Sequence, residues 1–187
     1  MTTAITEVPG LVAGTWTIDP THTEIAFTVR HLMSKVRGTF KEFEGSVVIA
    51  DDLEASSAEA TIQLASVETG TQQRDDHLRS SDFFEADSKP TMTYRSTGLR
   101  PAGEGFVSTG DLTIKDVTRE VELAVELLGV GHDPYGNERV GLEATGQISR
   151  KDFGIDFNIP LEGGKLLIGD TVTLSLTVQA VRQADAA

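Results

Sequence analysis

The sequence predicts an all-β domain of about eight antiparallel strands, and three observations predict it. Apolar and polar residues alternate with a period of two along most of the 187 residues, a pattern typical of strands with one buried face. Clusters of Gly, Pro, Asn and Asp separate these runs, as expected for turns. A helical period is scarce, so helices cannot cover both faces of a sheet.

The alternating runs define the strands. In the clearest run, over 171–180, Val172, Leu174 and Leu176 alternate with threonine and serine. Three similar runs cover 24–30, 58–64 and 120–127, and weaker runs cover 39–50, 90–99, 105–115 and 139–151.

Turn chemistry connects the strands. Residues 101–105, 133–137 and 162–164 contain the Pro, Gly and Asn residues that turns require. Lys115-Asp116 predicts a two-residue hairpin loop between strands that end at Ile114 and begin at Thr118. We expect one or two short helices, over 71–81 and as a single turn over 31–35.

The chain length predicts one domain. We expect a short, partly disordered leader over 1–14, a single β-barrel domain over 15–182 and a frayed tail over 183–187. The leader lacks a positive n-region and a continuous apolar stretch, so we do not expect it to act as a signal peptide. No run approaches the ~20 apolar residues that span a bilayer. These features predict a cytoplasmic protein without stable membrane insertion.

The composition restricts the partners. A net charge of −13 and a pI of about 4.6 disfavour binding to nucleic acid, because the surface repels phosphate backbones. The same charge opposes simple docking on anionic membranes. The absence of cysteine excludes disulfides and thiolate chemistry.

Two architectures can bury one apolar face per strand, a sandwich and a closed barrel, and alternation alone does not choose between them. A barrel of about eight strands is either filled by side chains or holds one small ligand. Small residues at inward positions, Ala58, Ala60 and Gly110, favour spare volume inside.

Four segments together resemble the YceI family of lipocalin-like, polyisoprenoid-binding proteins. They are Trp16–Asp19 with His22 and Phe27–Phe40, then Arg74–Phe84, then Gly110–Ile114, and finally Arg150–Ile155 with Ile168–Asp170. Their order and spacing carry the resemblance over about Thr15–Val181. Two departures are the missing secretion signal, which many relatives have, and Asp116, where the family usually has glycine.

The resemblance implies an extended eight-stranded antiparallel lipocalin-like barrel whose long apolar pore accommodates an isoprenoid chain. It also makes a homodimer reasonable. We therefore expect a protein that catalyses nothing and carries a long apolar amphiphile, such as a prenyl pyrophosphate or a quinone-like polyisoprenoid. No cofactor is expected.

The inward apolar positions are the candidates for lining such a pore. They are Ile25, Phe27, Val29, Phe43, Val47, Ile62, Leu64, Phe106, Leu112, Leu123 and Leu174. The alternative is that these side chains fill a solid core.

A short polar segment holds the candidates for a head-group site, Arg74, Asp75, His77 and Arg79, because arginine matches phosphate in a bidentate fork. His31, which alternation places on the face of Ile25 and Phe27, joins them. The alternative is a structural cap in which Asp75 and His77 bond to the backbone.

Two further functions remain open. One is a hydrolase-like or isomerase-like enzyme that uses a cluster of His22, His31 and His77, and the other is a ligand-free stress-response scaffold with a filled barrel. The sequence has no Gly-x-Ser-x-Gly elbow and no P-loop. It also lacks the His-x-His and His-Glu-x-x-His spacings, so we expect no metal.

Overall fold

A computed structural model describes residues 3–185, and eleven strand segments in it form one antiparallel sheet. In chain order they are β1 (Gly14–Ile18), β2 (Glu24–His31), β3 (Ser34–Phe40), β4 (Phe43–Ile49), β5 (Ser57–Gln63), β6 (Val67–Glu68), β7 (Thr91–Ala102), β8 (Gly105–Ile114), β9 (Val117–His132), β10 (Glu138–Ser149) and β11 (Ile168–Arg182). Within these residues the one α-helix is α1 (Gln72–Arg79). Short 3-10 helices are η1 (Ile5–Glu7), η2 (Pro20–His22), η3 (Leu53–Ala55), η4 (Leu64–Ser66), η5 (Arg150–Phe153) and η6 (Glu162–Gly164).

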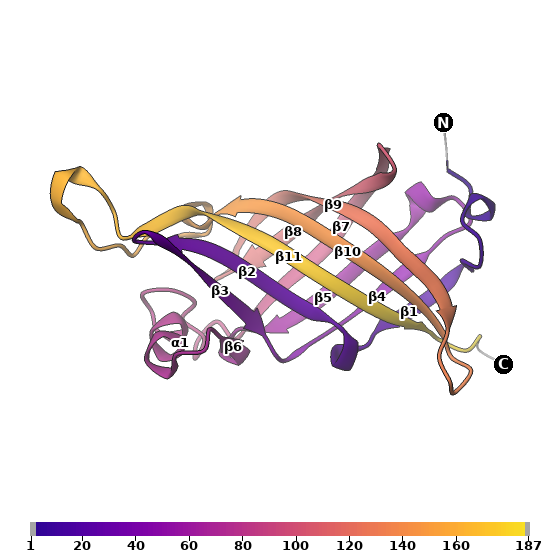
Figure 1. Cartoon of the computed structure of the whole chain (residues 1–187), viewed down its shortest axis with the longest axis horizontal. Helices are drawn as coiled ribbons and strands as arrows, with labels where there is room; N and C mark the ends of the chain where they lie inside the picture. The colour runs from indigo at the N-terminus through magenta and orange to yellow at the C-terminus, as the bar shows by residue number, and fades with distance from the viewer. Residues whose placement is uncertain (1–2, 186–187) are drawn as a thin grey trace.

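Eight of the strands close a barrel. The strands β1, β4, β5, β7, β8, β9, β10 and β11 each pair with the next, and β11 pairs back with β1. The strand β2 continues along β11 beyond β1, and β3 and β6 extend the wall at that end (Figure 1). The predicted eight-stranded antiparallel barrel is confirmed, and its closure decides against the sandwich.

The predicted strand over 39–50 is wrong as one element, because the chain changes partners in the middle of it. The strand β3 pairs with β2 and β6, whereas β4 pairs with β1 and β5. At the break, the Ser66 hydroxyl accepts hydrogen bonds from the backbone N–H groups of Lys41 and Glu42, at 3.1 and 3.0 Å. The serine thus satisfies donors that would lack a strand partner.

The helical turn predicted over 31–35 is also wrong. These residues form a tight hairpin in which His31 pairs with Ser34, and Leu32 adopts a left-handed φ of 55°. Strand pairing on both sides of Leu32-Met33 overrides any local helical tendency. The helix predicted over 71–81 is present as α1.

The Lys115-Asp116 loop has the predicted two residues, although β9 begins at Val117, one residue earlier than expected. Lys115 and Asp116 both have a left-handed φ, of 53° and 63°. Two consecutive left-handed residues are typical of the type I′ turn, whose twist matches that of the strands it joins. The Lys89 ammonium pairs with the Asp116 carboxylate beside this turn.

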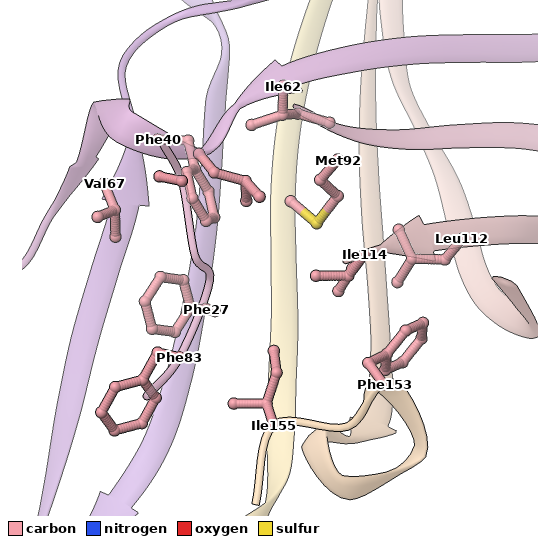
Figure 2. Close-up of a cluster of buried hydrophobic side chains, with 12 residues drawn as sticks. Phe27, Phe40, Ile62, Val67, Phe83, Met92, Leu112, Ile114, Phe153 and Ile155 are labelled. Carbon is pink, nitrogen blue, oxygen red and sulfur yellow. The ribbon is translucent and has the colours of Figure 1, made fainter. Parts of the chain in front are cut away.

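Two apolar clusters occupy the ends of the barrel. The larger, the α1-end cluster, is centred on Phe27, Phe40, Phe83, Phe153 and Ile155 and fills the interior beside α1 (Figure 2). The smaller, the termini-end cluster, surrounds the fully buried Trp16, Val140 and Ala180. The described ends of the chain lie at this second end (Figure 1).

The segment 3–13, where we expected a leader, lies across the termini end. The backbone N–H of Ile5 donates to Asp51 at 2.9 Å, and that of Leu53 donates to Thr3 at 3.0 Å. Ile5 is buried in the termini-end cluster. At the other terminus, Gln183 of the expected tail bonds through its N–H to Thr15 at 2.8 Å. Residues 1–2 and 186–187 of the expected leader and tail lie outside the described residues.

Within residues 3–185, no helix has the length and the apolar composition that crossing a bilayer requires.

A glycine makes room for an aromatic ring of the α1-end cluster. Phe27 pairs with Gly38 on the neighbouring strand, and its ring occupies the space that a Cβ on residue 38 would take. Any larger residue there would push the ring out of its position.

We predict that Gly38→Ala destabilises the fold by about 1–3 kcal/mol, the usual range for overpacking a core. Urea unfolding measures the change. Gly131→Ala is the matched control, because a Cβ at Gly131 would have no atom within 4 Å and its φ is not left-handed. Equal stability of the two variants would contradict the role of Gly38.

Candidate functional site

The barrel interior contains a cavity of about 260 Å³ between the two clusters. Every strand of the closed barrel contributes at least two residues to the wall except β1, which contributes Ile18 alone. Aliphatic and aromatic side chains dominate the lining. The cavity can therefore hold an apolar molecule without charged partners.

Eight of the eleven residues predicted to line a pore line this cavity. They are Ile25, Phe27, Val47, Ile62, Phe106, Leu112, Leu123 and Leu174. The other three lie elsewhere. Leu64 is fully buried in η4, and Phe43 packs against the α1-end cluster. Val29 lies further along β2 than Phe27, toward the hairpin, where it pairs with Val36.

Sequence reasoning missed several lining residues. Tyr94 and Ser108 belong to predicted strands, and their inward positions follow from alternation with Met92 and Leu112. Val8 and Leu11 line the cavity from the N-terminal segment. No local pattern could have found these two, because their position depends on pairing with residues 51–53, far along the chain.

Few polar groups face the cavity, and most of them already form hydrogen bonds within the protein. The hydroxyl of Thr23 bonds to the backbone of Gln179, and the hydroxyl of Ser96 accepts the N–H of Ala58 at 2.8 Å. The hydroxyls of Tyr94 and Ser108 bond to each other at 2.8 Å. Burial raises the pKa of the Tyr94 hydroxyl, so it keeps its proton at neutral pH.

The polar residues predicted to bind a head group lie outside this cavity. None of Arg74, Asp75, His77, Arg79 and His31 belongs to the described lining. Asp75 is buried, and its Oδ1 accepts the backbone N–H and the hydroxyl of Thr69, at 2.8 and 2.5 Å. Arg74 donates to the hydroxyl and to the carbonyl of the same Thr69, at 2.7 and 2.8 Å.

The remaining α1 side chains also fasten the helix to its surroundings. Arg79 donates to the carbonyl oxygens of Ala65 and Val67, at 2.7 and 3.0 Å. The His77 ring contacts Phe83 and Phe157 edge-on, with centroids 4.9 Å away in both cases, and bonds to Asp82 at 2.9 Å. The cap alternative is thus observed for Asp75, whereas His77 bonds to a side chain and not to the backbone.

The three histidines do not form a cluster. His22 and His31 flank β2, and an extended strand of that length separates them by roughly 25 Å. His22 bonds to Asp19 at 2.8 Å, and His77 belongs to α1. Among residues 3–185, no group of three or more His, Cys, Asp or Glu side chains is arranged to hold a metal ion.

An ion-pair network at the termini end surrounds Arg139, which donates to Asp19 and Asp133, both at 2.8 Å. The Arg139 and His22 hydrogen bonds lower the pKa of Asp19 to about 2. Because this pKa is lowered on folding, its contribution to stability is present above pH 4 and is lost as the pH falls toward 2. The network is structural, since its carboxylates hold the β9–β10 turn and the end of β1.

A buried arginine fastens the corner after β10. Arg150 is 4% exposed and donates to the carbonyl oxygens of Ile155, Phe157 and Gly169, at 2.8 to 2.9 Å. Burial lowers its pKa. Gly154 has the left-handed φ of 72° that the turn requires, so this segment is a conformational corner.

We predict that Asp75→Ala lowers the free energy of unfolding by about 1–3 kcal/mol, because the donors of Thr69 lose their buried acceptor. The neighbouring Asp76→Ala is the control, since this carboxylate is 64% exposed and its loss should change stability by less than about 0.5 kcal/mol. Chemical unfolding of both variants tests this. If Asp75→Ala is as stable as the parent, Asp75 does not fasten α1.

A closed eight-stranded antiparallel barrel around an apolar cavity defines the class of lipocalin-like binding barrels. Residues 16–180 match the YceI-like domain, so the chain belongs to the YceI family.

Similar proteins agree in sequence and in fold. The UPF0312 protein plu2095 of Photorhabdus laumondii is 39% identical over 164 residues, which cover 87% of this chain and 82% of that protein. The crystal structure of Burkholderia cenocepacia BcnA has a TM-score of 0.74 at 23% identity and covers 87% of this chain and 98% of its own. A polyisoprenoid binding domain from Saccharophagus degradans has a TM-score of 0.66 at 18% identity, with 92% and 100% covered.

Proposed function

We propose that this protein binds an isoprenoid chain inside the barrel and catalyses no reaction on it. The observation that carries the proposal is the apolar cavity of about 260 Å³ enclosed by the strands. The Saccharophagus domain, which has the same fold and is named for polyisoprenoid binding, supports it.

Burial of the chain supplies the affinity. Each CH₂ group moved from water to an apolar wall gains ~0.8 kcal/mol. A ten-carbon prenyl chain therefore gains of the order of 8 kcal/mol before the costs of association are subtracted. The empty cavity forfeits packing contacts in the free protein, and a ligand restores them.

The cavity volume limits how much chain fits. A dry apolar cavity of ~150 Å³ holds benzene, which has six carbon atoms. In proportion, about 260 Å³ holds roughly ten carbon atoms, or two isoprene units. A longer polyisoprenoid therefore needs extra room, which displacement of the N-terminal segment with Val8 and Leu11 would provide.

The other two candidate functions receive less support. A filled scaffold would have no cavity of this size between its two clusters. The separated His22, His31 and His77 do not supply an acid–base group next to a bound chain. The α1 residues are engaged with Thr69 and neighbouring carbonyls, so they do not carry the proposal either.

Lipid extraction of the purified protein, followed by mass spectrometry, tests the proposal. We expect a prenyl compound to be released in a fixed ratio to protein. Complete absence of an apolar compound, together with no binding of added geraniol, which has ten carbon atoms, in calorimetric titration would contradict it.

We predict that Ala144→Phe weakens geraniol binding at least tenfold, because Ala144 is buried, lines the cavity and would place a ring inside it. Isothermal titration calorimetry measures the change. Thr145→Phe is the matched control, since residue 145 is exposed on the outer face of the same strand. Equal losses in both variants, or in neither, would argue against ligand in this cavity.

A further inference from the structure

A pair of hydroxyl groups interrupts the apolar lining in the middle of the barrel. On β8, the inward positions run from Phe106 of the termini-end cluster, through Ser108 and Gly110, to Leu112 of the α1-end cluster. Ser108 is 7% exposed, and its hydroxyl bonds to that of Tyr94 at 2.8 Å. The pair therefore lies within the cavity and not at its rim.

Gly110 allows Tyr94 to reach this position. A Cβ at residue 110 would lie 2.5 Å from the Cζ and hydroxyl oxygen of Tyr94. Only glycine leaves the ring room to lie across β8. Gly110 thus makes room for the phenol of Tyr94 in a part of the cavity wall that an aliphatic side chain could line instead.

The Tyr94–Ser108 pair can donate one further hydrogen bond. Two hydroxyls carry two protons and four lone pairs, and the bond between them uses one proton and one lone pair. The side-chain bonds of residues 3–185 include no other partner for either oxygen. One O–H group is therefore available to donate to an acceptor on a bound molecule.

Positive charge is absent from the same wall. No Arg, Lys or His belongs to the described lining, and the one charged lining residue is Glu59. The Glu59 carboxylate is 61% exposed and lies 3.7 Å from Arg95 on the outer surface. A diphosphate in the cavity would lose its hydration without gaining a cation, which is strongly unfavourable.

We infer that the cavity selects isoprenoids with an uncharged oxygen, an alcohol or a ketone-type carbonyl, which the Tyr94–Ser108 pair hydrogen-bonds, over prenyl diphosphates. This inference rests on the proposed function and specifies the chemical class of its ligand. It also replaces α1 as the place where a head-group oxygen is recognised.

Three probes with the same ten-carbon prenyl skeleton separate the contributions of the chain, the hydroxyl group and the charge to binding. They are ocimene, which is a hydrocarbon, geraniol, which is an alcohol, and geranyl diphosphate. In calorimetric titrations of the full chain, we expect geraniol to bind about fivefold more tightly than ocimene, as one added hydrogen bond gives. Geranyl diphosphate should bind at least tenfold more weakly than geraniol.

The double variant Tyr94→Phe with Ser108→Ala should lose the preference for geraniol over ocimene, so that it binds the two probes about equally. The single variant Tyr94→Phe keeps Ser108 and should lose only part of the preference. Thr113→Val with Thr118→Val is the matched control, because it removes a hydroxyl pair of the same 2.8 Å length from β8 and β9, and neither residue lines the cavity. That control should bind all three probes like the parent.

The outcomes separate this inference from the proposed function. If ocimene and geraniol both fail to bind, the proposed function is wrong. If ocimene binds but geraniol binds no better, or if the double variant keeps the preference, only the role of the hydroxyl pair is wrong. Diphosphate binding as tight as that of geraniol would overturn the selection against charge.

Discussion

The pairing of β11 with three partners is the constraint on which the rest of the structure depends. One edge of this strand pairs with β10 from Ser149 to Arg139, and the other pairs with β2 and then with β1. This double pairing closes the sheet, and closure removes the exposed edges that an open sheet would present. Every apolar strand face must then point into one shared interior, so the interior is where function can arise.

The interior is packed at its ends and hollow between them. Aromatic residues from β2, β3 and the segment after α1 fill the α1 end (Figure 2). Trp16, Ile5 and Leu53 fill the other end, beneath the N-terminal segment. The small lining residues Ala58 and Ala60 lie between them and leave the volume that larger side chains would occupy. This arrangement favours the binding of an elongated apolar ligand inside the barrel over an interior filled by side chains.

The sequence was sufficient to predict the strands and most of the cavity wall, because alternation directly reports which side chains point inward. The three lining predictions that differ, Val29, Phe43 and Leu64, do not line the cavity. Alternation carries no information on position along a barrel axis, and it could not show that the chain leaves the strand at Leu64 and forms η4. The break at Lys41 depends on a hydroxyl from Ser66, and the contribution of Leu11 depends on pairing with residues 51–53. Such long-range contacts leave no local signal.

The polar residues of α1 show why residue type alone misleads about sites. Arginine and histidine in one short segment are groups that would bind a phosphate, but here Arg79 donates to the carbonyl oxygens of Ala65 and Val67, and His77 bonds to Asp82. Conversely, Tyr94 and Ser108 are ordinary strand residues whose importance depends on their apolar surroundings. Whether a polar side chain can bind a ligand therefore depends on its neighbours in the fold more than on its residue type.

Diffraction from crystals pressurised with xenon tests whether the barrel interior is hollow, because xenon enters dry apolar cavities without needing any specific contact. We predict xenon density inside the barrel, bounded by Phe106, Leu123, Leu142 and Leu174. Density for side chains throughout that space, with no xenon within the barrel, would contradict it.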